Sequence, residues 1–154
     1  MATSKGKQFE QRFKQDWQTS IPNSFLVRLP DQVSGYKGNA DNICDFIAYA
    51  NKKLFLLECK SHKGNTFPLQ CFPQYKKLSQ EDGKEGIVAG VILWFIEHDK
   101  VLFVPISTFT LLYKDNKKSF NINMLKDKTY PAIEIPSKKL RTFMQSDYKI
   151  LLEI

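Results

Sequence analysis

The chain has 154 residues and a mass of 17.9 kDa, the size of one domain that can close a hydrophobic core without disulfides or a structural metal. Hydrophobic residues make up 42% and aromatic residues 13%, which excludes an intrinsically disordered chain. Lys and Arg outnumber Asp and Glu by 23 to 16, and the net charge of +7 favours a polyanionic partner, nucleic acid before an anionic membrane. The lysines would equally serve a protein that only needs a soluble surface. We expect a single domain over residues 1–154.

The three cysteines are odd in number and match no CxxC pattern, so reduced thiols are expected and a zinc site is not. The chain opens with no apolar stretch typical of a signal peptide. The longest apolar run, residues 87–96, is too short to span a bilayer. The sequence therefore predicts a cytoplasmic protein with no membrane partner.

The first predicted element is an amphipathic helix, because Phe9, Phe13 and Trp17 recur every four residues among polar side chains. Thr3 or Ser4 can cap its start. Residues 21–23 break the helix at Pro22, and residues 24–29 are typical of a strand. The segment that follows is rich in Gly, Asn and Asp and is expected to be a loop over 31–42.

After residue 42, the sequence predicts strands and helices in alternation. The expected elements are strands 43–50 and 53–61 joined by Asn51-Lys52, a helix over 70–80, a hairpin of strands 86–97 and 100–106, a short helix over 108–113, short segments at 122–125 and 132–135, and a closing segment at 150–154. This order predicts an α/β (α+β) fold, a mixed β-sheet flanked by helices. The order of the strands in the sheet does not follow from one sequence.

The first predicted hairpin brings two acids together. If Asn51 and Lys52 form a two-residue turn, Ala50 pairs with Lys53, and counting outward places Asp45 directly opposite Glu58. Opposed residues of an antiparallel pair have Cβ atoms roughly 4.5 to 5.5 Å apart, and like charges at that distance repel each other. Two carboxylates in this position need a cation between them.

Strand alternation places Lys60 on the same face as Glu58, while Leu57 and Cys59 point the other way with Cys44 and Phe46. Two acids and a lysine suit metal-dependent phosphodiester hydrolysis: carboxylates hold Mg²⁺, and an ammonium stabilises the charge that develops on phosphate. The alternative is a solvated strand face, since short motifs of this kind arise by chance. The apolar run 54–57 favours a strand covered on both sides, where charged residues need a reason to be present.

These residues resemble a known family. Asp45 together with Glu58-Cys59-Lys60 is similar to the D…ExK core of the PD-(D/E)xK, or restriction-endonuclease-like, superfamily. Residues 66–72 followed by Gln74, the GVILWF strand at 90–95 and the opening GKxFE at 6–10 are similar to the RecU type of Holliday junction resolvase. The resemblance covers most of the chain.

The resemblance implies a restriction-endonuclease-like fold and a metal site of Asp45, Glu58 and Gln74. Mg²⁺ is the implied cofactor, for which Mn²⁺ can substitute, and Lys60 is the implied transition-state stabiliser. It further implies a homodimer that cuts four-way DNA junctions in a bacterial or phage-infected cell. Three positions depart from the family. Ile43 stands where a polar Thr is usual, Gln70 competes with Gln74 because the segment before it is shorter, and residues 29–42 leave little length for a stalk that inserts into a junction.

Further candidate residues come from the neighbouring segments. Glu10 can face the active site from the first helix, or it can be there because acids are favoured near a helix N-terminus. Tyr36 and Lys37 in the long loop combine an aromatic ring and a cation, as DNA-binding loops do, although such loops are as often plain connections. Lys76 and Lys77 are the expected phosphate contacts on the helix after Gln74.

Three functions remain open from the sequence. The leading one is a metal-dependent endonuclease that resolves Holliday junctions in recombination and repair. The second is another PD-(D/E)xK nuclease with a different DNA target, and the third is a basic DNA-binding module without catalysis. Two uncompensated acids would repel phosphate, which counts against the third.

Overall fold

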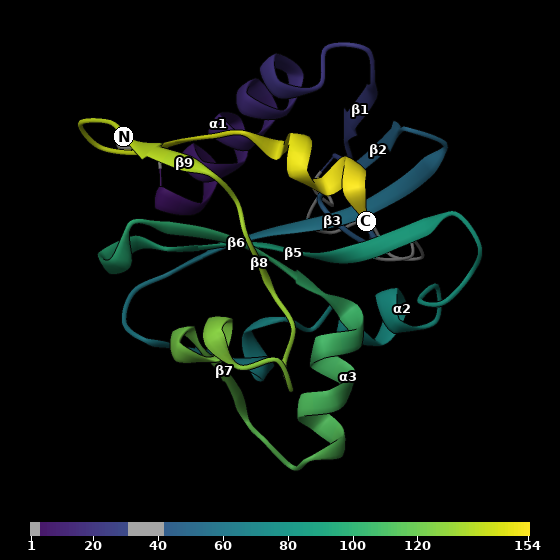
Figure 1. Ribbon diagram of the computed structural model, residues 1–154, viewed down its shortest axis with the longest axis vertical. Helices are drawn as coiled ribbons and strands as arrows, with labels where there is room; N and C mark the ends of the chain where they lie inside the picture. Colours follow the sequence, from purple (N-terminus) through teal and green to yellow (C-terminus); the bar gives the residue numbers. More distant parts are fainter. Residues whose placement is uncertain (1–3, 31–41) are drawn as a thin grey trace, which may run out of the picture.

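A six-stranded mixed β-sheet forms the centre of the computed structural model, which describes residues 4–30 and 42–154 (Figure 1). The strand order is β1-β2-β3-β5-β6-β8. Only β3 and β5 are parallel, and the other neighbours are antiparallel. The strands are β1 (Phe25–Arg28), β2 (Phe46–Ala50), β3 (Lys53–His62), β5 (Ile87–Phe95), β6 (Lys100–Pro105) and β8 (Ile133–Glu134). The predicted mixed sheet flanked by helices is confirmed.

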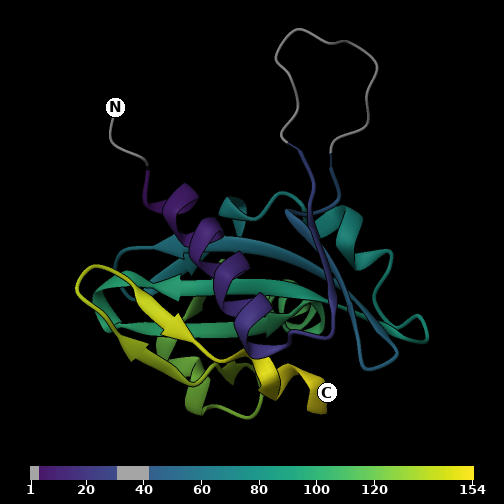
Figure 2. The ribbon, with the colours of Figure 1, turned by 90° about the horizontal axis from the view of Figure 1, so that it is seen from above.

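Two layers cover the two faces of this sheet (Figures 1 and 2). One layer consists of α1 (Lys5–Ser20), the β9–β10 ribbon (Ser137–Lys139 and Met144–Ser146) and the 3₁₀ helix η4 (Tyr148–Glu153). The other consists of η1 (Leu69–Cys71), α2 (Tyr75–Ser79), α3 (Ile106–Lys114), the β4–β7 pair (Thr66–Pro68 and Ser119–Asn121) and η3 (Ile122–Lys126). A further 3₁₀ turn, η2 (Ile96–His98), joins β5 to β6. Each layer has its own hydrophobic cluster against the sheet.

No helix in the described ranges is long and apolar enough to cross a membrane.

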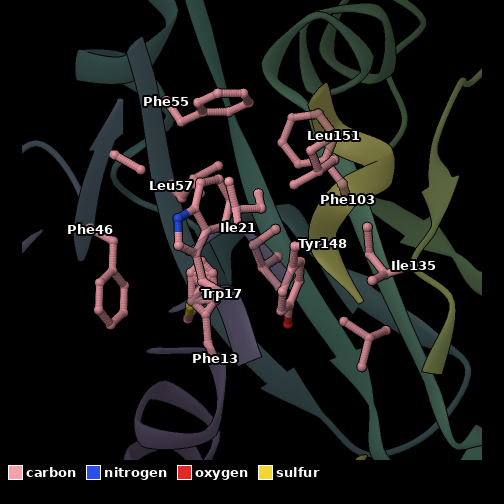
Figure 3. Packing of buried hydrophobic residues seen from close by; sticks show 14 of the residues in the cluster. Phe13, Trp17, Ile21, Phe46, Phe55, Leu57, Phe103, Ile135, Tyr148 and Leu151 are labelled. Carbon is pink, nitrogen blue, oxygen red and sulfur yellow. The ribbon is translucent and has the colours of Figure 1, made fainter. Parts of the chain in front are cut away.

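Helix α1 forms as its apolar spacing predicts. Ser4 caps it, because its Oγ accepts a hydrogen bond from the Lys7 N–H at 3.2 Å. Phe13 and Trp17 are completely buried, and both rings contact Tyr148 of η4 (Figure 3). The helix thereby packs against both the sheet and the C-terminal segment, which lie next to it in the same cluster.

The β2–β3 hairpin has the predicted turn and register. Asn51 and Lys52 have φ of 50° and 63°, the left-handed conformation that a two-residue type I′ turn requires at both positions. Ala50 pairs with Lys53 as predicted. Strand β2 begins at Phe46, however, and not at residue 43 as expected.

The late start of β2 also corrects the expected side of Cys44. Cys44 packs in the cluster beneath α2 and α3, whereas Phe46, Leu57 and Cys59 pack under α1. In a continuous strand, residues 44 and 46 would share a face. The chain therefore leaves strand geometry before Phe46, and strand alternation does not apply to Cys44.

The prediction of one continuous helix over 70–80 is wrong, because Pro73 divides this segment into two elements. Leu69–Cys71 form the 3₁₀ turn η1 and Tyr75–Ser79 form α2. Phe72, which precedes the proline, has φ −124° and ψ 69°, outside the helical region. The helix expected at 108–113 is present and longer, as α3. Tyr36, Lys37 and the loop expected over 31–42 lie outside the described residues, apart from its last residue, Asn42.

Candidate active site

Asp45 and Glu58 meet at the beginning of β2. Asp45 directly precedes this strand, and continuing the observed register by one pair places it opposite Glu58 in β3. The Cys59 N–H donates a hydrogen bond to Asp45 Oδ2 at 2.9 Å, which fixes the Asp45 carboxylate against β3. Glu58 is only 2% exposed, because β3 lies in the interior of the sheet between β2 and β5.

The two acids cannot easily be ionised together in this position. Burial raises the pKa of Glu58 to about 9, and Asp45 acts in the same direction through a hydrogen bond and through its charge. Lys60 lowers this pKa, and Glu10 raises it. Without a cation, the Glu58 carboxyl therefore holds a proton at neutral pH. A divalent cation can take the place of that proton and stabilise both carboxylates.

Lys60 lies beside Glu58, as strand alternation predicts. Its Nζ is 3.8 Å from Glu58 Oε2, and its side chain is 24% exposed. The ammonium thus touches the acid and also reaches the surface, where a phosphate of a bound polynucleotide can approach it.

Gln74 lies on the same face of the sheet as Glu58. Leu56, two residues before Glu58, packs in one cluster with Phe72 and Leu78, which flank Gln74 in sequence. Gln74 Oε1 is buried and has no hydrogen-bond partner. Gln70, the competing choice, is exposed. A buried amide oxygen without a partner favours Gln74 over Gln70 as the additional oxygen donor.

These donors fit a hard divalent cation. Asp45 and Glu58 supply carboxylate oxygens and Gln74 an amide oxygen, the atoms that Mg²⁺ prefers. No group of three His, Cys, Asp or Glu side chains within residues 4–30 and 42–154 could hold a metal ion. An ion at this site would therefore depend on two acids, an amide and water, as Mg²⁺ commonly does.

Glu10 lies across the sheet, in α1, and is held by an arginine. Arg28 of β1 donates to Glu10 Oε2 from Nη2 at 2.7 Å and from Nε at 3.0 Å. The charge of Glu10 nevertheless raises the pKa of both Glu58 and Cys59. Sequence reasoning missed Arg28, although a charged residue at the end of an apolar strand was a signal for it.

The expected phosphate contacts lie in the last turn of α2. Lys76 is exposed and Lys77 is half-buried. They follow Gln74, the N-cap of α2, by two and three residues, so the amide and these cations lie at the same helix, where the cations can meet DNA.

Comparison with known proteins gives a family match and a similar fold. Residues 31–145 match the RecU family, described as Recombination protein U. The fold is similar to the solved structure of Hjc, a Holliday junction resolvase from the archaeal hyperthermophile Archaeoglobus fulgidus, with a TM-score of 0.55 and 17% identity over 81% of this chain and 91% of that chain. No curated protein matches the sequence. The similarity to Hjc at this identity concerns the fold.

Proposed function

The chain belongs to the Recombination protein U family, and on this premise we propose that it is a Holliday junction resolvase, a DNA endonuclease that uses Mg²⁺. The family and the resolvase-like fold both support this function. The observation that carries the chemistry is the meeting of Asp45 and Glu58, two acids that need a cation between them. The proposal includes a cytoplasmic location in a bacterial or phage-infected cell.

Asp45, Glu58 and Gln74 would hold the ion, and Mn²⁺ could replace Mg²⁺. When bound, such an ion supplies positive charge that polarises a phosphodiester and lowers the pKa of water. Lys60 adds an ammonium beside Glu58, where negative charge develops on the phosphate during cleavage. Glu10 acts on the site through its charge on Glu58, with its own position set by Arg28. Lys76 and Lys77, and Tyr36 and Lys37 outside the described residues, are proposed to bind DNA.

The proposed assembly is a homodimer. Resolution of a four-way junction requires a cut in each of two symmetry-related strands. One subunit carries one pair of acids, so two subunits related by a two-fold axis would supply both sites.

The decisive experiment compares cleavage of a labelled four-way junction and of a duplex with the same sequence, with and without Mg²⁺. We expect Mg²⁺-dependent cutting of the junction, and we expect Asp45→Asn and Glu58→Gln to abolish it while DNA binding persists. Each substitution removes a metal ligand and leaves the basic surface intact. Glu134→Gln is the control. Glu134 is an exposed acid in β8, the edge strand of the sheet farthest from β1, and it pairs with Lys100 of β6.

Unchanged turnover in both acid variants would contradict the site. Cutting of the duplex as fast as the junction would instead indicate another nuclease of this superfamily. Binding of DNA without any metal-dependent cutting would indicate a non-catalytic DNA-binding module.

A further inference from the structure

Two neighbouring hollows lie on the side of the sheet covered by α2 and α3. One has a volume of about 540 Å³ and the other of about 420 Å³. They share Leu69, Gln70 and Tyr113 as lining residues, so they form one continuous depression, here called the α2–α3 groove. Lys76 lines one end, and Lys117 and Lys118 line the other.

The α2–α3 groove carries positive charge without compensation. Its lining includes three lysines and no acid. Lys76, Lys117 and Lys118 are exposed and make no ion pair with the residues that the structure describes. A hollow of about 380 Å³ between α1 and β10 differs, because Asp16 and Asp147 line it together with its lysines. Of these depressions, the α2–α3 groove is the one suited to a polyanion.

The groove is held in shape by hydrogen bonds and ring packing. The Tyr75 and Tyr113 rings pack at 4.7 Å between centroids, and the Tyr75 hydroxyl is 2.8 Å from Thr110 Oγ1. Beyond α3, the Lys117 N–H donates to the Leu112 carbonyl at 2.9 Å. The two ends of the groove are therefore fixed relative to each other before any ligand binds.

The backbone of η1 also holds the end of the groove that Lys117 and Lys118 line. The Leu69 N–H donates to the Lys118 carbonyl at 2.9 Å, and Pro68 pairs with Ser119 in the β4–β7 ribbon. Because these are main-chain contacts, alanine at Lys117 and Lys118 removes charge without removing the link. Both side chains are exposed, so the substitutions leave the packed core intact.

The groove begins on the helix that follows Gln74. Lys76 at its near end is two residues from the proposed amide ligand, and the groove runs from there to the turn after α3. A DNA strand held at the active site continues away from it in both directions. Pro73 and Tyr75, the sequence neighbours of Gln74, line the near end of the groove together with Lys76.

We propose that the α2–α3 groove binds the sugar–phosphate backbone of one duplex arm of the DNA, away from the cleavage site. This inference rests on the proposed function, because it assigns a place to an arm of the same substrate. Lys76, Lys117 and Lys118 neutralise phosphates, and the Gln70 amide and Tyr113 hydroxyl donate neutral hydrogen bonds to the backbone. Partial burial and the neighbouring Tyr75 raise the pKa of Tyr113, so its hydroxyl keeps the proton that it donates.

The test measures DNA affinity over a range of salt for the full-length K117A/K118A variant, with K138A/K139A as control. The control removes the same charge from two exposed neighbouring lysines of β9, in the layer on the other side of the sheet. Four-way junctions with long arms and with progressively shortened arms serve as ligands, with Ca²⁺ in place of Mg²⁺. K76A is a second variant, at the opposite end of the groove.

On long-armed junctions, K117A/K118A is expected to lower the slope of log affinity against log salt by about two units and K76A by about one. The affinity advantage of the unmodified protein over K117A/K118A then shrinks roughly tenfold between 50 and 200 mM salt, since each lost phosphate contact removes about 0.9 from the slope. K138A/K139A keeps the slope of the unmodified protein. On arms too short to reach the groove, K117A/K118A and the unmodified protein bind alike.

Three results would overturn the groove assignment. The first is a salt slope for K117A/K118A equal to that of K138A/K139A on long arms. The second is a loss of affinity in K117A/K118A that is the same at every arm length. The third is a loss of affinity confined to single-stranded oligonucleotides. Failure of the proposed function would appear separately, as a protein that does not cut the junction with Mg²⁺. The groove experiment measures only binding and does not depend on that outcome.

Discussion

At the scale of single residues, the site consists of two acids that are costly to bury side by side unless a cation lies between them. Glu58 is placed by the central strand of the sheet, and Asp45 by a hydrogen bond from the backbone of β3. The price of this arrangement is a pKa for Glu58 raised to about 9. A protein gains from two such acids when a cation is part of its function.

Lys60→Ala tests whether the lysine beside Glu58 belongs to this chemistry. Its Nζ lies 3.8 Å from Glu58 Oε2, so it should act mainly on charge that appears in the transition state. We expect the activation free energy of single-turnover cleavage to rise by about 2.7 to 4 kcal/mol, the usual contribution of one preorganised donor, so that the rate falls. DNA affinity should change much less, because many lysines share ground-state binding.

The matched comparison is Lys76→Ala, measured at two salt concentrations. This exposed lysine of α2 should weaken binding and lower the salt slope by about one unit. If Lys60→Ala showed the same behaviour, Lys60 would be a phosphate anchor and not part of the catalytic set.

At the scale of elements, the packing of β5 against β6 depends on one glycine. A Cβ added at Gly90 would lie 2.6 Å from a Phe103 ring carbon and 2.6 Å from the Val104 carbonyl oxygen. The carbonyl belongs to the neighbouring strand and cannot move without distorting the sheet. Gly90 therefore leaves room for the Phe103 ring to pack against β5.

Gly90→Ala should lower the free energy of unfolding by about 1 to 3 kcal/mol, the usual cost of overpacking. Urea denaturation measures the change. Gly6→Ala is the control, because a Cβ at Gly6 meets nothing within 4 Å. Since Gly6 lies in α1, alanine there should leave stability unchanged or raise it by up to about 1 kcal/mol. Equal stability of the two variants would mean that β5 and β6 readily move apart.

At the scale of the whole molecule, the proposed resolvase should act as a symmetric homodimer. Light scattering should give twice the chain mass of 17.9 kDa at working concentrations. Subunits without substitutions, mixed with Glu58→Gln subunits, should form dimers that cut one strand of a junction and leave the other intact, because each subunit supplies one site. A monomeric mass with junction cutting intact would contradict the dimer.

Much of the active-site hairpin could be predicted from the sequence because the rules involved are local. A two-residue turn at Asn51-Lys52 sets the register, and strand alternation then places Lys60 beside Glu58. Strand β2 begins three residues later than the sequence pattern predicts, and Pro73 breaks the helix expected over 70–80. In both places the backbone departs from the regular pattern, before Phe46 in one case and around Pro73 in the other.

The sequence by itself determined α1, the two main hairpins and the meeting of Asp45 with Glu58, since each depends on periodicity or turn geometry within a short segment. Only the tertiary structure decided the strand order, the pairing of Glu10 with Arg28, and the groove that joins Gln70 to Lys117 and Lys118. These contacts connect segments that are far apart along the chain. Such contacts form when whole layers pack against the sheet, and the pattern of one segment carries no information about which distant segment will cover it.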